Sequence, residues 1–296
     1  MGVTGVTGAI AQGFAVLGEQ SVAEHIEAVQ RQIRANPQNA GLRLALCHFL
    51  AVRGEWERAE EQLKRATQLD TTFTPASVTC AMALAAERHR ADVWNGTRAP
   101  ILLGGNAEWV EQLIAAAALP PERTDEAAAL RESARQAAPA LQGALTQVDR
   151  SDSRAAQALD GEPVERTAFT WLCDGDVRLG PVLELLTPTG YAWLPLTEVR
   201  RIKFSRPRHL VDLLWAPAET ERHDGRALNG LVPVRYPGPL EGLDDDTALG
   251  RRTDWLPLAG EEQYAGQGQR TLISEAGDHS MLDLRLIEFN SEGTAA

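Results

Sequence analysis

The first half of the chain repeats its apolar residues at the spacing of an α-helix. Ile26, Val29 and Ile33 fall on one helical face. Ser21, followed three residues later by a glutamate, forms a capping box that marks the start of this helix. Pro37 marks its end, because the residue before a proline avoids the helical conformation. The same spacing predicts further helices near residues 42–53, 56–69, 74–94, 106–114 and 124–139.

The second half has a different pattern. Residues 141–166 are polar, rich in alanine and weakly patterned, and we interpret them as a linker. After them, apolar residues begin to alternate with polar ones. Residues 182–186 and 191–196 predict a β-hairpin. Frequent glycine and proline beyond it are typical of a mainly antiparallel β domain. The predicted fold class is therefore α+β, with a helical domain at residues 1–150 and a mainly β domain at residues 151–296.

Residues 40–73 resemble one tetratricopeptide unit, a helix-turn-helix of about 34 residues. Gly54 fits the turn between the two helices, and Trp56 is the bulky residue that follows it. Ala59 is the small residue expected where the helices cross closely. On this interpretation Trp56 is buried at a contact between hairpins, and the helical half is tetratricopeptide-like.

The match to that repeat has departures, so an ordinary helical hairpin stays open as the alternative. Arg43 occupies a position where tryptophan is usual, and Cys47 one where glycine or alanine is usual. Arrays of such units bind a peptide or a helix in a concave groove. The groove face of the first helix would then include Leu44, His48 and Val52, which we predict to bind a partner.

The composition and net charge of the chain limit the kinds of molecule that we expect it to bind. The 296 residues carry a formal net charge of −12, and the pI is near 5.0. A nucleic-acid binder needs a basic surface to neutralise phosphates, and an anionic membrane surface likewise attracts basic segments. No apolar run approaches the ~20 residues that span a bilayer. We therefore expect neither nucleic acid nor a membrane as a partner.

Residues with catalytic or metal-ligand chemistry are scattered along the chain. Cys47, Cys80 and Cys173 have no disulfide or metal spacing, which fits a reducing cytoplasm. The six histidines form no metal-binding motif. The sequence therefore predicts no metal, no cofactor and no recognisable set of catalytic residues.

One cluster of charged residues leaves two interpretations. Asp174 and Asp176 flank a glycine just before Arg178. Two carboxylates could bind a divalent cation or act as acid and base. We favour a turn in which the aspartates accept backbone N–H groups and pair with Arg178, since no further oxygen ligands are spaced nearby. Four tryptophans are expected in the core of the β half: Trp171, Trp193, Trp215 and Trp255.

Seven blocks follow one another along the chain: RGEWERAEEQL, TWLCDGDVRLGPVLELL, YAWLPLTEVRRIKF, DLLWAPAE, LVPVRYPG, RRTDW and GQGQR. Together they resemble the ImpE/SciE-type family, also called TagJ, of type VI secretion accessory proteins. The resemblance covers residues 20–290. It implies a non-enzymatic cytoplasmic protein that binds an N-terminal helix of the small subunit of the contractile sheath. It further implies an indirect link to sheath handling by the ClpV-type AAA+ ATPase.

The resemblance brings no catalytic assignment to any residue. Its motif positions suit a folded β module, with glycine and proline at turns, tryptophan in the core and a polar network around the aspartates. An enzyme or small-molecule binder that uses the aspartate–arginine cluster is the alternative, and an oligomeric scaffold is a third possibility. The motif residues are Trp171, Asp174, Asp176, Arg178, Gly180, Trp193, Trp215, Arg235 and Tyr236.

Overall fold

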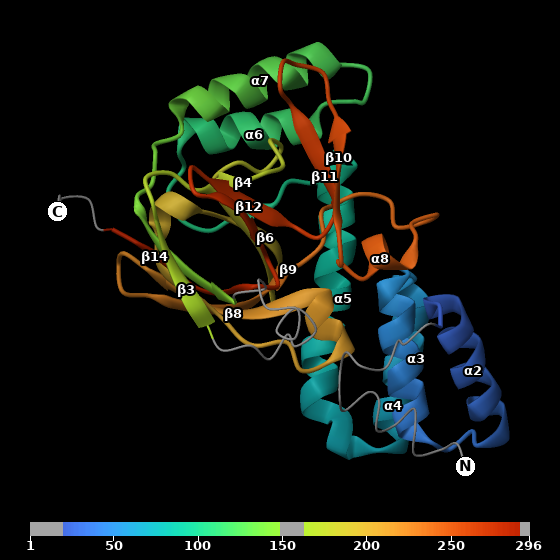
Figure 1. Cartoon of the computed structure of the whole chain (residues 1–296). Coiled ribbons are helices and arrows are strands. Elements are labelled where there is room, and N and C mark those ends of the chain that lie inside the picture. The colour runs from blue at the N-terminus through green and yellow to red at the C-terminus, as the bar shows by residue number, and fades with distance from the viewer. Residues whose placement is uncertain (1–19, 149–162, 291–296) are drawn as a thin grey trace.

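The computed structural model describes residues 20–148 and 163–290, and it has the expected α+β class, with helices followed by a mostly antiparallel sheet (Figure 1). Its α-helices are α2 (Val22–Ala35), α3 (Ala40–Val52), α4 (Trp56–Leu69), α5 (Thr74–Trp94), α6 (Glu108–Ala118), α7 (Thr124–Ala137) and α8 (Asp245–Ala248). Three short 3-10 helices are η1 (Thr71–Phe73), η3 (Leu196–Glu198) and η4 (Leu210–Leu213).

Local signals in the sequence fix the first helices. The predicted capping box is present, because the Ser21 side chain accepts from the Glu24 amide and the Glu24 carboxylate accepts from the Ser21 amide. Helices α3 and α4 form a hairpin around Gly54, whose φ of +73° favours glycine. A Cβ at Gly54 would also lie 2.8 Å from Cδ1 of Leu240. The turn of the hairpin is thus packed closely against the β part of the chain.

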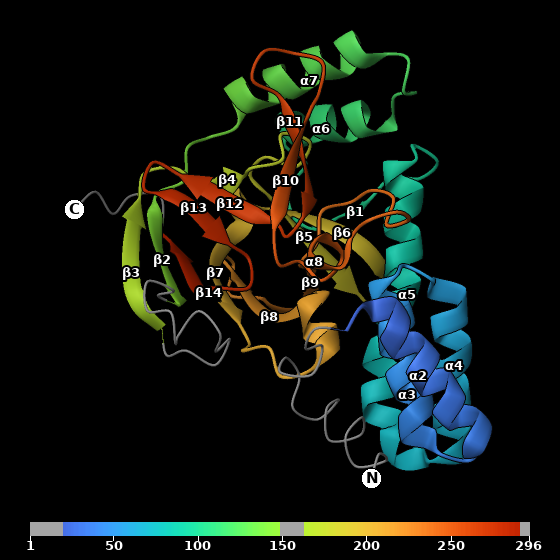
Figure 2. The ribbon, with the colours of Figure 1, turned by 45° about the vertical axis from the view of Figure 1, so that its right-hand side comes forward.

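Helix α5 joins the two parts of the molecule. It runs between the layer of α2, α3 and α4 and the large sheet, and it packs on α4 and on strands β5 and β6 (Figures 1 and 2). Cys80 and Leu84 are buried along it, but so are Glu87 and Arg90. A helix that is covered on both sides must bury its charged residues as well, and these need partners.

The large sheet has nine strands in the order β1-β6-β5-β9-β8-β7-β14-β2-β3. Neighbouring strands are antiparallel except β1 and β6, which are parallel. The strands are β1 (Ile101–Leu102), β2 (Gly143–Val148), β3 (Pro163–Phe169), β5 (Val182–Thr187), β6 (Gly190–Pro195), β7 (Val199–Phe204), β8 (Trp215–Arg222), β9 (Ala227–Pro233) and β14 (Leu284–Phe289). The predicted hairpin is the pair β5–β6.

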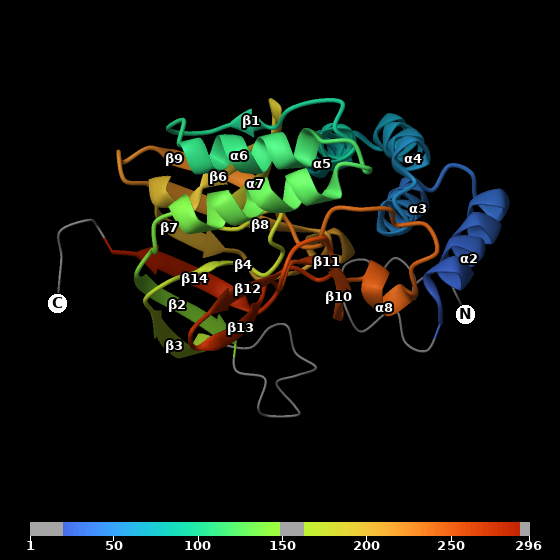
Figure 3. The same ribbon diagram turned by 90° about the horizontal axis from the view of Figure 1, so that it is seen from above.

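Two smaller sheets and the helical hairpin α6–α7 lie beside the large sheet (Figure 1). Strands β4 (Cys173–Asp174), β12 (Thr271–Ser274) and β13 (Gly277–Ser280) form one small sheet, and β10 (Thr253–Pro257) and β11 (Tyr264–Gly268) form the other. Helices α6 and α7 lie side by side over this region, and the β10–β11 hairpin rises beside α7 (Figures 1 and 3).

The interpretation of residues 141–166 as a linker is wrong for their described part. Strand β2 lies within them and pairs with both β3 and β14, and its Ala144, Leu145 and Val148 are buried. Its apolar residues are few, so the strand pattern was weak, and its place in the sheet comes from partners distant in the sequence. The expected division at residue 150 falls between β2 and β3, which pair with each other.

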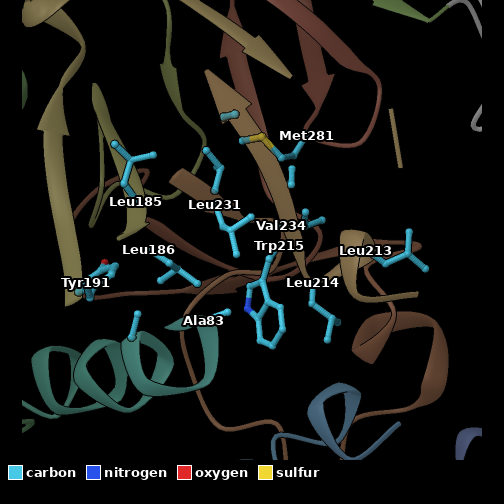
Figure 4. Close-up of a cluster of buried hydrophobic side chains, with 14 of the residues drawn as sticks. Ala83, Leu185, Leu186, Tyr191, Leu213, Leu214, Trp215, Leu231, Val234 and Met281 are labelled. Atoms are coloured by element: carbon cyan, nitrogen blue, oxygen red, sulfur yellow. The ribbon is translucent and has the colours of Figure 1, made fainter. Parts of the chain in front are cut away.

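The tryptophans of the β half differ in burial. Trp193 and Trp215 are buried, as expected. Figure 4 shows Trp215 beside Ala83 of α5 and the strand residue Leu231, so it packs where the helix meets the sheet. Trp171 and Trp255 are exposed by 37% and 39%, so their expected place in the core was wrong. Trp171 lies in the connection between β3 and β4, and Trp255 lies on the two-stranded sheet, where its ring packs against Tyr236 and stays partly exposed.

Candidate functional site

The turn that follows β4 carries the cluster of charged residues found in the sequence. Oδ1 of Asp174 accepts from the amide of Asp176 at 2.9 Å, and Oδ1 of Asp176 accepts from the amide of Arg178 at 2.9 Å. Aspartates favour such turns because their carboxylates replace a backbone acceptor two residues on. Both carboxylates are buried. They therefore hold the turn together, which is the interpretation that the sequence favoured.

Each aspartate is also paired with an arginine. Nη2 of Arg178 lies 2.5 Å from Oδ2 of Asp176, which also accepts from the Gly266 amide at 3.0 Å. Asp174 is paired with Arg270, whose Nε and Nη2 donate to Oδ2 at 2.9 and 2.7 Å. Arg270 is fully buried. Buried charges are tolerated when paired and hydrogen-bonded in this way.

Arg270 extends the cluster into a larger ionic network under the sheet. Its Nη1 lies 3.0 Å from Oε2 of Glu184, and Glu184 also accepts from Nε of Arg90 at 2.7 Å. The hydroxyl of Tyr191 donates to Glu184 as well. Arg90 comes from α5 and Glu184 from β5, so these ion pairs tie the helix to the sheet.

Arg235 anchors the ends of two helices. Its Nη1 donates at 2.7 Å to the carbonyl oxygens of both Val52 and Ala248, which are the last residues of α3 and α8. The last carbonyls of a helix lack intrahelical partners and carry the negative end of its dipole, so a guanidinium stabilises both. Burial lowers the pKa of Arg235 to about 10, so it keeps its charge at neutral pH.

The pKa values of the network follow from burial and pairing. Burial raises the pKa of Asp174 to about 6, although Arg270 acts in the opposite direction. Burial acts in the same way on Glu184, but Arg90 and Arg270 outweigh it and lower the pKa of that carboxyl. Both carboxyls are therefore ionised at neutral pH.

The sequence missed three members of this network: Arg90, Glu184 and Arg270. One signal was available, because Glu184 interrupts the apolar run VLELL of a strand that is buried along its length. A charged residue at such a position requires a buried partner. Which arginine supplies the partner depends on tertiary structure alone, since Arg90 is 94 residues away.

Two open grooves lie on either side of the Asp174–Arg178 turn. The first, which we call the α7 groove, has a volume of about 950 Å³ and lies between α7, the β10–β11 hairpin and residues 171–181. The second, which we call the α5 groove, has a volume of about 880 Å³ and lies between α5, the start of α4 and residues 235–241. Asp174 lines the α7 groove and Arg178 the α5 groove.

The α5 groove has an aromatic and ionic lining. Trp56 and Trp94 line it together with Glu87, Arg90 and Arg178. The Arg178 guanidinium lies 5.0 Å from the ring centre of Trp94, a cation–π contact. Trp56 is half-buried and packs with its ring 6.4 Å from that of Trp215 in the sheet. The expectation of a contact between helical hairpins was therefore wrong for Trp56, which lies where the helices meet the β part.

The residues predicted to bind a partner through a concave helical face are not accessible. Leu44, His48 and Val52 are all buried, and η4 packs against α3. The prediction is corrected for this reason: the β part of the same chain covers the helical face that a free-standing array would leave open. Gly54 and Ala59 do have their expected roles, because Gly54 forms the turn and Ala59 is fully buried in the hairpin.

Residues 20–148 and 163–290 contain neither a metal-binding cluster nor a membrane-spanning helix. Within these ranges no group of three or more histidine, cysteine, aspartate or glutamate side chains is placed to hold a metal ion. None of the helices in these ranges has the length and apolar character needed to cross a membrane.

Comparisons with known proteins agree with the resemblance seen in the sequence. The family model described as ImpE protein matches residues 166–288. The type VI secretion system accessory component TagJ of Pseudomonas aeruginosa is 40% identical over 265 residues, which cover 89% of this chain and 86% of that protein. The crystal structure of protein VPA1032 from Vibrio parahaemolyticus superposes with a TM-score of 0.77 at 24% identity and covers 92% of this chain and 94% of that one. At that identity the structural match supports the fold alone.

Proposed function

The chain belongs to the ImpE family, and from this premise we propose that it is a non-enzymatic accessory protein of the type VI secretion system. We propose further that it is an adaptor in the cytoplasm. It binds an N-terminal helix of the small sheath subunit, and through that subunit it is linked to sheath handling by the ClpV-type ATPase. The similarity to the Pseudomonas aeruginosa accessory component over most of both chains carries the proposal.

The burial and pairing of Asp174 and Asp176 support an adaptor function more than an enzymatic one. A catalytic carboxylate must reach a substrate, and a metal ligand must have free oxygen atoms. Asp174 and Asp176 are buried and are engaged by arginines and turn amides. The alternative, a small-molecule or metal site formed by these aspartates and Arg178, would require breaking the ionic network that ties α5 to the sheet.

Calorimetric titration of the full chain with a synthetic peptide tests the proposal. The peptide carries the N-terminal helix of the small sheath subunit, and a scrambled peptide of the same composition is the control. We expect saturable binding with a Kd below ~100 μM, equivalent to more than about 5 kcal/mol. Absence of binding by protein that remains folded would contradict the proposed function.

A second experiment addresses the link to the ATPase. The ClpV-type ATPase is captured on a resin and incubated with this protein, with and without the small sheath subunit. We expect retention of the protein only when the sheath subunit is present, since the proposed link is indirect. Equal retention without the subunit would contradict the indirect link while leaving the helix binding intact.

A further inference from the structure

Two exposed aromatic side chains, Trp171 and Tyr264, line the α7 groove. Six large apolar side chains are exposed in the part of the chain that the structure describes, and four of them lie on the β10–β11 hairpin or at the β3–β4 connection. These four are Trp171, Trp255, Leu256 and Tyr264. Trp171 and Tyr264 line the groove itself. Exposed aromatic rings in a groove are typical of a surface that another molecule covers.

The shape of the groove suits a helix. Helix α7 contributes Ala128, Ala129 and Ala134 to the lining, and the small side chain of the exposed Ala129 allows the backbone of a ligand to approach closely. An α-helix with its side chains is about 10–12 Å across and rises 5.4 Å per turn, so the groove volume corresponds to about two turns. An amphipathic helix binds such a groove through side chains one turn apart.

The two walls of the groove are fixed to each other. Oε1 of Gln263 accepts from Nε of Arg131 on α7 at 2.7 Å, and Nε2 of Gln263 donates to the carbonyl oxygen of Ala128 at 3.0 Å. Nη2 of Arg131 also donates to the carbonyl oxygen of Ala259 at 3.2 Å. The loop between β10 and β11 is therefore held to α7 from within. A groove formed in advance loses little freedom when it binds.

The charges at the rim of the groove indicate the charge of the ligand. Glu132, Glu261 and Glu262 line the rim, and Arg135 is the basic residue exposed among them. The Arg135 charge is offset locally, because its Nη2 lies 2.6 Å from Oε1 of Glu132. Arg131 also lines the groove, but its side chain is buried and donates to Gln263, so the exposed rim is acidic, in keeping with the net charge of −12. Complementarity requires basic residues on the flanks of the bound helix.

We propose that the α7 groove binds the apolar face of an amphipathic helix whose flanks carry lysine or arginine, with Trp171 and Tyr264 as the aromatic contacts. This inference rests on the proposed function and assigns the helix-binding surface within it. The α5 groove is the less suitable of the two, because a helix placed there would cover the partly exposed guanidinium of Arg178. The predicted helical face at Leu44, His48 and Val52 is closed by the chain itself.

Titration of variants of the full chain with the sheath-helix peptide tests this assignment. Trp171→Ala removes an aromatic contact, and Ala129→Phe fills the groove from an exposed position on α7. We expect each change to weaken binding at least tenfold, as for a central interface residue. Leu69→Ala is the matched control, since Leu69 is exposed by 38% on α4, and we expect its affinity within twofold of the unaltered protein. Unfolding midpoints show that each variant is folded.

Charge exchange gives an independent readout. Glu261→Lys combined with Glu262→Lys should weaken binding of the peptide several-fold. The same variant should bind better than the unaltered protein does when the basic residues of the peptide are replaced by glutamate. Stronger binding of the glutamate peptide by the lysine variant supports contact between the peptide and the rim. Equal affinity of both proteins for both peptides overturns that contact.

The outcomes separate the inference from the proposed function. If the unaltered protein does not bind the peptide, the proposed function fails and the groove assignment fails with it. If the unaltered protein binds and Trp171→Ala and Ala129→Phe bind equally well, the groove assignment alone is overturned. Loss of binding by Trp94→Ala, with the α7-groove variants unaffected, would also overturn it and would assign the helix to the α5 groove.

Discussion

The α7 groove and the α5 groove lie on opposite sides of the same five-residue turn, yet they differ in what lines them. The α7 groove has alanines, two exposed aromatic rings and exposed charges at its rim, and its buried charged residues, Arg131 and Asp174, are bonded within the chain. The α5 groove opens onto Arg90 and Arg178, members of the ionic network that joins helices and sheet. The difference indicates a division of roles, in which one side of the turn is available to a partner and the other holds the molecule together.

The largest effect should come from breaking the network behind the α5 groove. Glu184→Gln leaves Arg90 and Arg270 without their shared carboxylate in a fully buried site. Removing one partner of a buried ion pair costs about 3–5 kcal/mol, and we expect a loss of that size in urea unfolding. Glu60→Gln is the control, because Glu60 is paired with Lys64 at the surface and should cost at most about 1 kcal/mol. Equal costs would show that the network is not structural.

The next effect concerns His48, which lies buried on the helical side. Burial, and secondarily His209, lowers the pKa of His48 to about 4 from the ordinary 6.5. Between these two pH values the folded state therefore binds fewer protons than the unfolded state. The free energy of unfolding is highest above pH 6.5, where His48 is neutral in both states, and it decreases as the pH falls towards 4. The loss should reach about 3 kcal/mol by pH 4.

His48→Gln tests this pH dependence. The difference in unfolding free energy between the unaltered protein and the variant is measured at intervals from pH 7 to pH 4. We expect the unaltered protein to lose about 3 kcal/mol relative to the variant over this range. A constant difference would mean that His48 titrates normally and is more accessible than its burial indicates.

Alanine variants of Trp56 and Trp171 allow the aromatic residues of the two grooves to be compared. Trp56→Ala removes a ring that packs on Trp215 at the junction of helices and sheet, and we expect it to cost about 2 kcal/mol of stability, less than for a fully buried tryptophan. Peptide affinity should stay within twofold. For Trp171→Ala we expect the smaller loss of stability and the larger loss of affinity. Identical behaviour of the two variants in both measurements would remove the distinction between the grooves.

The smallest effect should be that of salt on peptide binding. The acidic rim of the α7 groove is exposed, so its attraction for a basic helix is screened at high ionic strength. Raising sodium chloride from about 50 to 500 mM should weaken binding a few-fold, mainly through slower association. Glu261→Gln combined with Glu262→Gln should reduce this salt dependence. An unchanged salt dependence in the double variant would place the basic residues of the peptide elsewhere.

Predictions from the sequence succeeded where one segment contains its own determinants. The capping box at Ser21, the turn at Gly54 and the hairpin β5–β6 all follow from residues close together in the chain. Strand β2 was missed because its pairing with β14 joins segments about 140 residues apart. Residues with strong local signals were placed correctly, and those that depend on distant partners were not.

The candidate site shows the same limit. Spacing alone indicated that Asp174 and Asp176 form a turn with Arg178, because an aspartate can accept the amide two residues on. The sequence could not show that Arg270 and Glu184 complete the network. Nor could it show that Trp171 faces solvent while Trp193 is buried, since both lie in apolar surroundings along the chain.

Local patterns and motifs along the chain were enough to establish the α+β class, the helical hairpin with Gly54 and Ala59, the family and the aspartate turn. Which helical face is covered, and which residues line the two open grooves, follow from contacts between segments that are distant in the chain. An apolar stripe along a helix has the same pattern whether it faces the core or a partner. At Leu44, His48 and Val52 the β part of the chain covers that stripe, and the exposed apolar surface lies instead beside α7.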